Sequence, residues 1–294
     1  MYLEQFKRDS SSILKYIPYV FGFVGFMILN LIASALSGSD STEVIQNMIA
    51  QNGKNTTFLL LLLPFVFFLA MLFLWWKAAH KYSITQLTTA RRKIDWKRIG
   101  FSFIVWTLMN LAVFMVSYFM NPQDFQFQFN LSSFIVLLII ALIFIPIQTS
   151  FEEYFFRGYF LQFTAFVSKN KGVALVVSSV IFGLMHMGNP EFSDMGISIM
   201  IFYIGCGFLL GVMTLMDDGL ELALGFHAAQ NLLGALLITS NTAVFQTDAL
   251  FLFNGVSSIW ELLIQVFIIF PILLYVFSKK YNWTHWKQKL FKSL

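Results

Sequence analysis

The sequence is poor in cysteine and in charge, and both shortages exclude whole classes of protein. Its single cysteine, Cys206, excludes an intramolecular disulfide and any zinc site built from several cysteines. Only 12% of the 294 residues are charged, whereas soluble domains average about 25%. The H-E-x-x-H motif of soluble zinc peptidases is missing as well, and no internal repeat is visible. An ordinary soluble domain is therefore excluded.

The sequence is instead rich in hydrophobic residues, which make up 58% of the chain and include 36 phenylalanines. The mean hydropathy is +0.73. A helix needs about 20 apolar residues to cross a bilayer. We therefore predict an all-α, polytopic membrane helix bundle that forms one domain over 1–294, with about eight transmembrane helices. The predicted helices span 16–37, 57–79, 99–120, 131–150, 172–189, 196–216, 219–239 and 258–278.

The basic residues predict how the bundle is oriented, because cytoplasmic loops carry an excess of lysine and arginine. Eighteen of the 19 basic residues fall on one predicted side, and Lys54 is the exception. This asymmetry predicts that both termini are cytoplasmic. The basic segments are the N-terminal tail (Lys7, Arg8, Lys15), the loop 77–98, the segment 151–171 and the C-terminal tail after 278.

These observations predict a multi-pass integral protein, located in the cell membrane if the source is bacterial. The charged start and long first apolar run indicate that the first helix, rather than a cleaved signal peptide, directs insertion. The positive charge of the loop 77–98 is explained by the excess of basic residues that cytoplasmic loops carry. We therefore expect the lipid bilayer as a partner and no nucleic acid. The sequence carries no indication of oligomeric state.

Three ionisable residues interrupt the fourth predicted helix: Glu152, Glu153 and Arg157. A charge at the centre of a bilayer costs about 2.5–3.5 kcal/mol on insertion scales, so such residues indicate a functional site by default. Glu153 and Arg157 are four residues apart and share a helix face, which predicts a local ion pair. Glu152 is rotated by about 100° and cannot share that partner. The two glutamates would serve equally well with their roles exchanged.

Two further predicted helices carry polar residues at helical spacing. Phe182 lies one turn before His186, and His227 lies one turn before Asn231. The polar turn 168–171 predicts a hairpin, with Glu153 and His186 each roughly 25 Å along its two arms at 1.5 Å per residue. Antiparallel packing would then bring the carboxylates and His186 together.

The same polar residues also have purely structural explanations. A buried Glu–Arg pair can simply lock a bundle, and an intramembrane histidine can satisfy an interhelical hydrogen bond. Three helices with inward polar groups favour a common site. For the run Asp217–Glu221 we prefer a structural interpretation, in which Asp218 is a helix N-cap and Glu221 completes a capping box.

The ordered set Glu152-Glu153-x-x-x-Arg157, Phe182-x-x-x-His186 and His227-x-x-x-Asn231 resembles the three motifs of the CPBP family. This family comprises the type II CaaX-prenyl endopeptidases and their bacterial Abi or bacteriocin-processing relatives. The resemblance covers about 148–235, and it implies a catalytic core at about 131–240. It implies an intramembrane endopeptidase that cleaves a membrane-anchored protein or peptide.

Roles for individual residues follow from this resemblance. It implies that Glu152 activates a water with the help of His186, and that His227 and Asn231 stabilise the oxyanion. It further implies that Glu153 and Arg157 support the site, while Phe182 forms its wall. A buried carboxylate suits a general base, and an amide with an imidazole N–H suits an oxyanion hole.

Whether a metal takes part is left open by the sequence. His186, His227 and Glu152 are a three-ligand set suited to catalytic zinc, with water as the fourth ligand. The family is often described as metalloproteases. A glutamate-activated water needs no metal, and we prefer this metal-independent mechanism.

Two functions from other classes are alternatives to a protease. A proton-coupled transporter also uses intramembrane Glu and His, although it would be expected to show inverted repeats or paired broken helices. A non-catalytic immunity or scaffold protein could retain the same residues without using them for chemistry.

Overall fold

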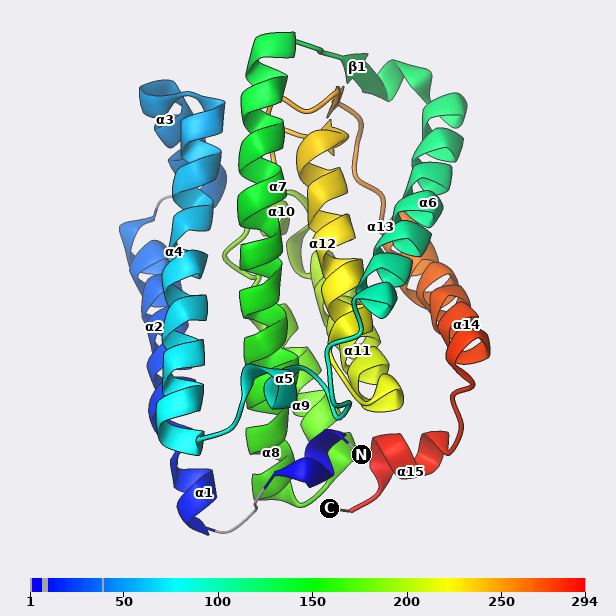
Figure 1. The fold of residues 1–294 in the computed structure, drawn as a ribbon. Helices are drawn as coiled ribbons and strands as arrows, with labels where there is room; N and C mark the ends of the chain where they lie inside the picture. The colour runs from blue at the N-terminus through cyan, green and yellow to red at the C-terminus, as the bar shows by residue number, and fades with distance from the viewer. Residues whose placement is uncertain (1, 7–9, 39, 294) are drawn as a thin grey trace.

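The computed structural model describes residues 2–6, 10–38 and 40–293. The bundle is all-α apart from three very short strands (Figure 1). Two members of the predicted basic tail, Lys7 and Arg8, lie outside the described residues.

Each of the eight predicted hydrophobic segments contains a helix. Several are interrupted by π-helical turns or continue into further helices, so the elements are more numerous than the segments. The principal helices are α2 (Ile17–Ser37), α4 (Lys54–Trp75), α6 (Trp96–Met120), α7 (Leu131–Glu153), α9 (Lys171–Leu184), α11 (Ile199–Asp217), α12 (Glu221–Leu236) and α14 (Phe270–Tyr281). Shorter helices are α1 (Ser10–Leu14), α3 (Ser41–Asn52), α5 (Ile84–Thr88), α8 (Leu161–Ser168), α10 (Pro190–Met195), α13 (Ile259–Ile264) and α15 (Trp286–Phe291).

Among the described residues, six helical segments are long and apolar enough to cross a membrane. The protein is therefore an integral, multi-pass membrane protein. The two remaining principal helices are shorter: α9 has 14 residues and α12 has 16. At 1.5 Å per residue, 16 residues extend about 24 Å, which is less than the ~30 Å hydrocarbon core. The count of eight full spans and the cytoplasmic location of the termini remain predictions.

The two ends of the chain lie at the same end of the bundle (Figure 1). Near the N-terminus, Glu4 forms an ion pair with Lys171 at 3.0 Å. Near the C-terminus, Ser293 forms an isolated antiparallel bridge with Asn170. The predicted hairpin between α8 and α9 is confirmed, because α8 ends at Ser168 and α9 begins at Lys171. Both terminal segments therefore meet this turn.

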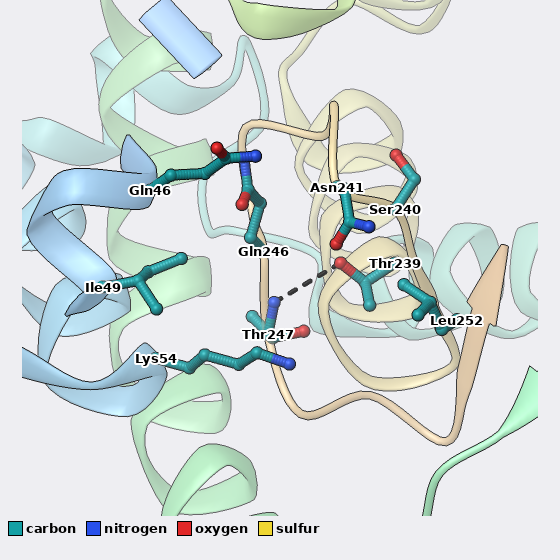
Figure 2. A pocket seen from close by; sticks show the side chains of 9 residues that line it. All are labelled: Gln46, Ile49, Lys54, Thr239, Ser240, Asn241, Gln246, Thr247 and Leu252. Atoms are coloured by element: carbon teal, nitrogen blue, oxygen red, sulfur yellow. Dashed lines mark hydrogen bonds between the residues drawn. The ribbon is translucent and has the colours of Figure 1, made fainter. Parts of the chain in front are cut away.

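The opposite end of the bundle carries a small three-stranded sheet in the order β1-β3-β2. β1 (Phe125–Phe127) pairs antiparallel with β3 (Phe251–Phe253), which pairs parallel with β2 (Ile238–Thr239). The sheet ties the α6–α7 connection to the segment that follows α12. A pocket at this end lies between the α3–α4 region and the same segment (Figure 2). It is lined mainly by polar side chains, including Lys54, which pairs with Asp248 at 3.2 Å.

Helices α9 and α11 approach each other very closely, because glycines face the contact from both sides. A Cβ atom at Gly207 would lie 2.6 Å from the carbonyl oxygen of Ser179. One at Gly183 would lie 3.0 Å from the backbone nitrogen of Ile204. Small residues at such contacts let helix backbones pack closely in a membrane. This contact places the end of α9 against the first turns of α11.

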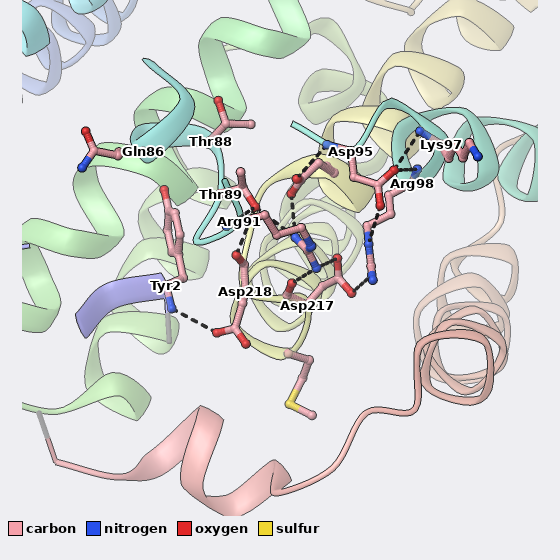
Figure 3. A network of polar contacts seen from close by, with 12 residues as sticks. Tyr2, Gln86, Thr88, Thr89, Arg91, Asp95, Lys97, Arg98, Asp217 and Asp218 are labelled. Atoms are coloured by element: carbon pink, nitrogen blue, oxygen red, sulfur yellow. Dashed lines mark hydrogen bonds and ion pairs between the residues drawn. The ribbon is translucent and has the colours of Figure 1, made fainter. Parts of the chain in front are cut away.

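A network of ion pairs joins the basic loop 77–98 to the junction between α11 and α12 (Figure 3). Asp217 is 3% exposed and pairs with Arg91 at 3.0 Å and with Arg98. Arg91 also pairs with Glu221, which is fully buried, at 3.2 Å. Buried carboxylates require such partners because removing an ion from water costs several kcal/mol. The network holds the start of α12 in place.

The capping-box interpretation of this junction is wrong. Asp218 has a left-handed backbone conformation at the end of α11, and Leu220 is the N-cap of α12 without a side-chain capping bond. Glu221 is used by Arg91 and the Asp95 backbone N–H. Local spacing suggested a cap, but the long-range arginines decide the roles of these carboxylates.

We expect Asp217→Asn to destabilise the protein more than Asp218→Asn. The first change leaves two arginines with a weakened buried partner, at a cost of about 3–5 kcal/mol if the pair is broken. The second changes a group whose side chain is 28% exposed and whose ion pair with Lys289 is expected to contribute about 1 kcal/mol or less. Thermal unfolding of the purified variants in detergent measures the difference. Equal or reversed effects would contradict this account of the junction.

Candidate active site

The buried charges of the site come from one continuous helical segment. Glu152 and Glu153 end α7, and Arg157 lies in the π-helical segment Tyr154–Phe160 that follows it. The predicted ion pair is confirmed: Arg157 Nη1 lies 2.9 Å from Glu153 Oε1. The side chains of Glu153 and Arg157 are 0% and 1% exposed. A carboxylate and a guanidinium are therefore held together away from water, where neither is tolerated alone.

His227 on α12 is a second partner of Glu153. Its Nδ1 lies 2.7 Å from the same Glu153 oxygen that accepts from Arg157. An ionised carboxylate only accepts, so Nδ1 carries the proton. The other ring nitrogen, Nε2, lies 3.5 Å from Glu152 Oε2. Glu153 thus fixes the orientation of the His227 ring, and the ring turns its free nitrogen towards Glu152.

Glu152 and Glu153 each have one carboxylate oxygen without a hydrogen bond among the described residues, but the other oxygen of Glu152 is bound by a neutral amide and not by a cation. Glu152 Oε1 accepts from Gln148 Nε2 at 2.5 Å. Its Oε2 is buried and has no hydrogen-bond partner among the described residues, although His227 Nε2 lies 3.5 Å away. This oxygen therefore has acceptor capacity that no described residue uses.

Gln148 is a site residue that the sequence reasoning did not select. Its amide oxygen accepts from Asn231 Nδ2 at 2.9 Å, while its amide nitrogen donates to Glu152. Gln148 therefore links Asn231 on α12 to the carboxylate of Glu152. The available signal was its spacing four residues before Glu152, which places both on one face of α7. Asn231 keeps a second N–H that this contact does not use.

His186 lies just beyond the end of α9, in the turn that follows Leu184. Its Nδ1 donates to the backbone carbonyl of Phe182 at 2.7 Å. The Nε2 atom of the neutral ring is then the one with a free lone pair. The Phe182 ring lies 4.7 Å from the His186 ring and 6.2 Å from the His227 ring. Phe182 is the expected wall, and both imidazoles border it.

Phe182 also contacts the cation of the site. The guanidinium carbon of Arg157 lies 4.0 Å from the centre of the Phe182 ring. Such cation–π contacts are worth about 2 kcal/mol or more when they are desolvated. Arg157 Nη2 additionally donates to the Gly207 carbonyl at 3.4 Å. The three predicted motifs are therefore connected through Phe182 and Glu153.

The donor atoms proposed for zinc meet only part of what a metal requires. The Nδ1 atoms of His186 and His227 are both held by oxygen acceptors, which is the usual arrangement for metal-binding histidines. However, no three His, Cys, Asp or Glu residues in the described part of the chain are grouped so that they could hold one ion. The arrangement of His186, His227 and Glu152 thus does not fit a three-ligand centre.

Comparison with known proteins finds a family model that matches part of the chain. Residues 130–233 match the Rce1-like family, described as type II CAAX prenyl endopeptidase Rce1-like. The matched segment contains all seven residues of the three motifs, and the family resemblance is confirmed over it. Over these residues the chain is similar to the CAAX-protease type of membrane protein.

One curated relative has no assigned function. The chain is similar to the uncharacterized protein YyaK of Bacillus subtilis (strain 168), with 35% identity over 183 residues. The similarity covers 62% of this chain and 61% of the relative's length. No solved structure matches the chain.

We expect Arg157→Met to destabilise the protein strongly, because it leaves the fully buried Glu153 carboxylate without its main counter-ion. Breaking a buried pair in this way costs about 3–5 kcal/mol. The double variant Glu153→Gln/Arg157→Met removes both charges and is expected to recover part of the loss. Thermal unfolding in detergent measures all three proteins. A double variant that is less stable than Arg157→Met would show that the pair is not what holds the segment.

Proposed function

We propose that the protein is an intramembrane endopeptidase that hydrolyses a peptide bond of a membrane-associated protein or peptide. The observation that carries this proposal is the different treatment of two adjacent buried carboxylates. Glu153 is bound by Arg157 and His227 and its side chain is 0% exposed, whereas the hydrogen bond of Glu152 comes from the neutral Gln148 amide and its side chain is 11% exposed. A general base needs a carboxylate that is not paired with an arginine, and a structural lock does not. The proposal assigns the catalytic core to about 131–240 within a single domain.

In the proposed reaction, a water held at Glu152 Oε2 attacks the carbonyl carbon of the substrate peptide bond. Glu152 accepts the proton of this water as the new C–O bond forms. The same proton is then transferred to the nitrogen of the leaving amine as the C–N bond breaks. The free lone pair of His186 Nε2 provides a second acceptor that orders the water. No enzyme nucleophile is required.

The negative charge that develops on the substrate oxygen needs donors. Asn231 offers the N–H that Gln148 does not use, which supports the role of oxyanion donor. His227 offers Nε2, and because Nδ1 already donates to Glu153, this role requires a proton on both ring nitrogens. Glu153 and Arg157 support this arrangement without touching the substrate.

The buried position of the site supports a substrate that is itself embedded in or anchored to the bilayer. Every site residue described above lies among apolar helices of a multi-pass membrane protein. A prenyl group, a lipid anchor or an apolar leader peptide would each bring a peptide bond to this depth. The proposal covers this class and does not select one member.

We expect Glu152→Gln to reduce cleavage by about a hundredfold or more, because it removes the base at nearly constant side-chain volume. His186→Ala should reduce cleavage as well. Peptide ends in membranes that contain the wild-type protein or the variant can be compared by mass spectrometry. Uncleaved precursors should accumulate with the variants.

The matched control for this experiment is Glu261→Gln, which alters an exposed carboxylate in α13. It should leave the set of cleaved precursors unchanged. Thermal unfolding should show that Glu152→Gln is folded. Wild-type levels of cleavage by folded Glu152→Gln would refute the proposed function.

We further propose that cleavage does not depend on a metal ion. Purified protein acting on a precursor found in that comparison should keep its activity in the presence of EDTA or 1,10-phenanthroline, and zinc analysis should give far less than one ion per chain. A zinc peptidase with the H-E-x-x-H motif is the positive control for the chelators. Loss of activity that added zinc restores would overturn this part of the proposal.

A further inference from the structure

Tyr203 on α11 forms the second wall of the His186 ring, and none of the three motifs includes it. The two rings are stacked, with centroids 4.3 Å apart and planes at 22°. The Phe182 ring contacts His186 as well, at 4.7 Å and 52°. The imidazole is thus held between aromatic rings from two helices.

The contacts of His186 restrict different motions of its ring. The hydrogen bond from Nδ1 to the Phe182 carbonyl fixes one ring nitrogen, but the ring can still rotate about that bond. A parallel aromatic ring on its face opposes this rotation, because tilting the imidazole would break the stacking. With both contacts present, the direction of Nε2 is determined.

The Tyr203 ring is itself held from several directions. Its hydroxyl accepts from Asn189 Nδ2 at 3.1 Å, and the carboxylate of Glu191 lies near it. Glu191 Oε1 is in turn bound by the backbone N–H of Val244 at 2.9 Å. Asn189 and Glu191 belong to the segment that directly follows His186. The segment that directly follows His186 therefore holds the Tyr203 ring that stacks on this histidine.

The close contact between α9 and α11 makes this stacking geometrically feasible. Gly183 lies three residues before His186, and a side chain at this position would collide with the backbone of Ile204. Ile204 directly follows Tyr203. The absence of a side chain at Gly183 thus allows the backbone of α11 to approach closely enough for the two rings to stack.

We infer that Tyr203 is a positioning residue, whose aromatic ring holds the His186 imidazole in its working orientation. The ring performs this role, and the hydroxyl serves to hold the ring. This inference rests on the proposed function, because it assigns His186 a part in the chemistry. A residue that aligns a catalytic group should affect turnover more than substrate binding.

The test compares Tyr203→Phe, which keeps the ring, with Tyr203→Leu, which removes it. We expect Tyr203→Phe to keep kcat within about threefold of wild type and Tyr203→Leu to lower kcat by about tenfold, with little change in KM. Phe208→Leu removes a half-buried ring elsewhere on α11 and is the matched control, with near wild-type kcat expected. The substrate is a precursor identified from the Glu152→Gln comparison, and thermal unfolding is measured for each protein.

Each outcome bears on the inference separately from the proposed function. If wild type and Glu152→Gln cleave equally, the proposed function fails before Tyr203 is examined. If Glu152→Gln is inactive but folded Tyr203→Leu has wild-type kcat, the positioning role is overturned. The same conclusion follows if Tyr203→Phe is as impaired as Tyr203→Leu, or if only KM changes. Should Tyr203→Leu fail to fold, Tyr203→Met fills the same space without a ring and is scored in the same way.

Discussion

The structure depends on a carboxylate and a guanidinium that are buried together among apolar helices. Glu153 and Arg157 are almost completely inaccessible, and removing either group alone would leave a buried charge without its main counter-ion. Their remaining contacts lie on other helices: His227 on α12 bonds Glu153, and Gly207 on α11 accepts from Arg157. The requirement to satisfy one ion pair therefore draws three helices together around the site.

The same requirement separates the functions of the two adjacent glutamates. Because Glu153 binds both Arg157 and His227, it is committed to holding the helices and the imidazole ring in place. Glu152, one residue earlier, is turned away from Arg157 and is bound only through one oxygen by Gln148. The helical rotation of about 100° per residue thus produces, from neighbouring positions, a carboxylate paired with arginine and one that is not.

Aromatic side chains provide the remaining support. Phe182 contacts the guanidinium of Arg157 on one side and borders both histidine rings. Tyr203 covers the face of His186 from the adjacent helix. A phenyl ring can contact a cation and an imidazole without an unsatisfied polar atom of its own, which suits a site buried among apolar helices. At the far end of α12, the arginines of the basic loop hold Asp217 and Glu221, so the helix that carries His227 is anchored there too.

The sequence by itself determined the properties that depend on local order. Hydropathy identified a helix in each of eight segments, helical spacing paired Glu153 with Arg157, and the polar turn 168–171 predicted the hairpin between α8 and α9. Tertiary structure alone decided which residues from separate helices meet. Gln148 and Tyr203 acquire their contacts from Asn231 and His186, and two distant arginines bind Asp217 and Glu221 at the junction where a capping box was expected. Periodicity reports which face of a helix a residue occupies, but the partner facing it depends on packing between helices that are far apart in the chain.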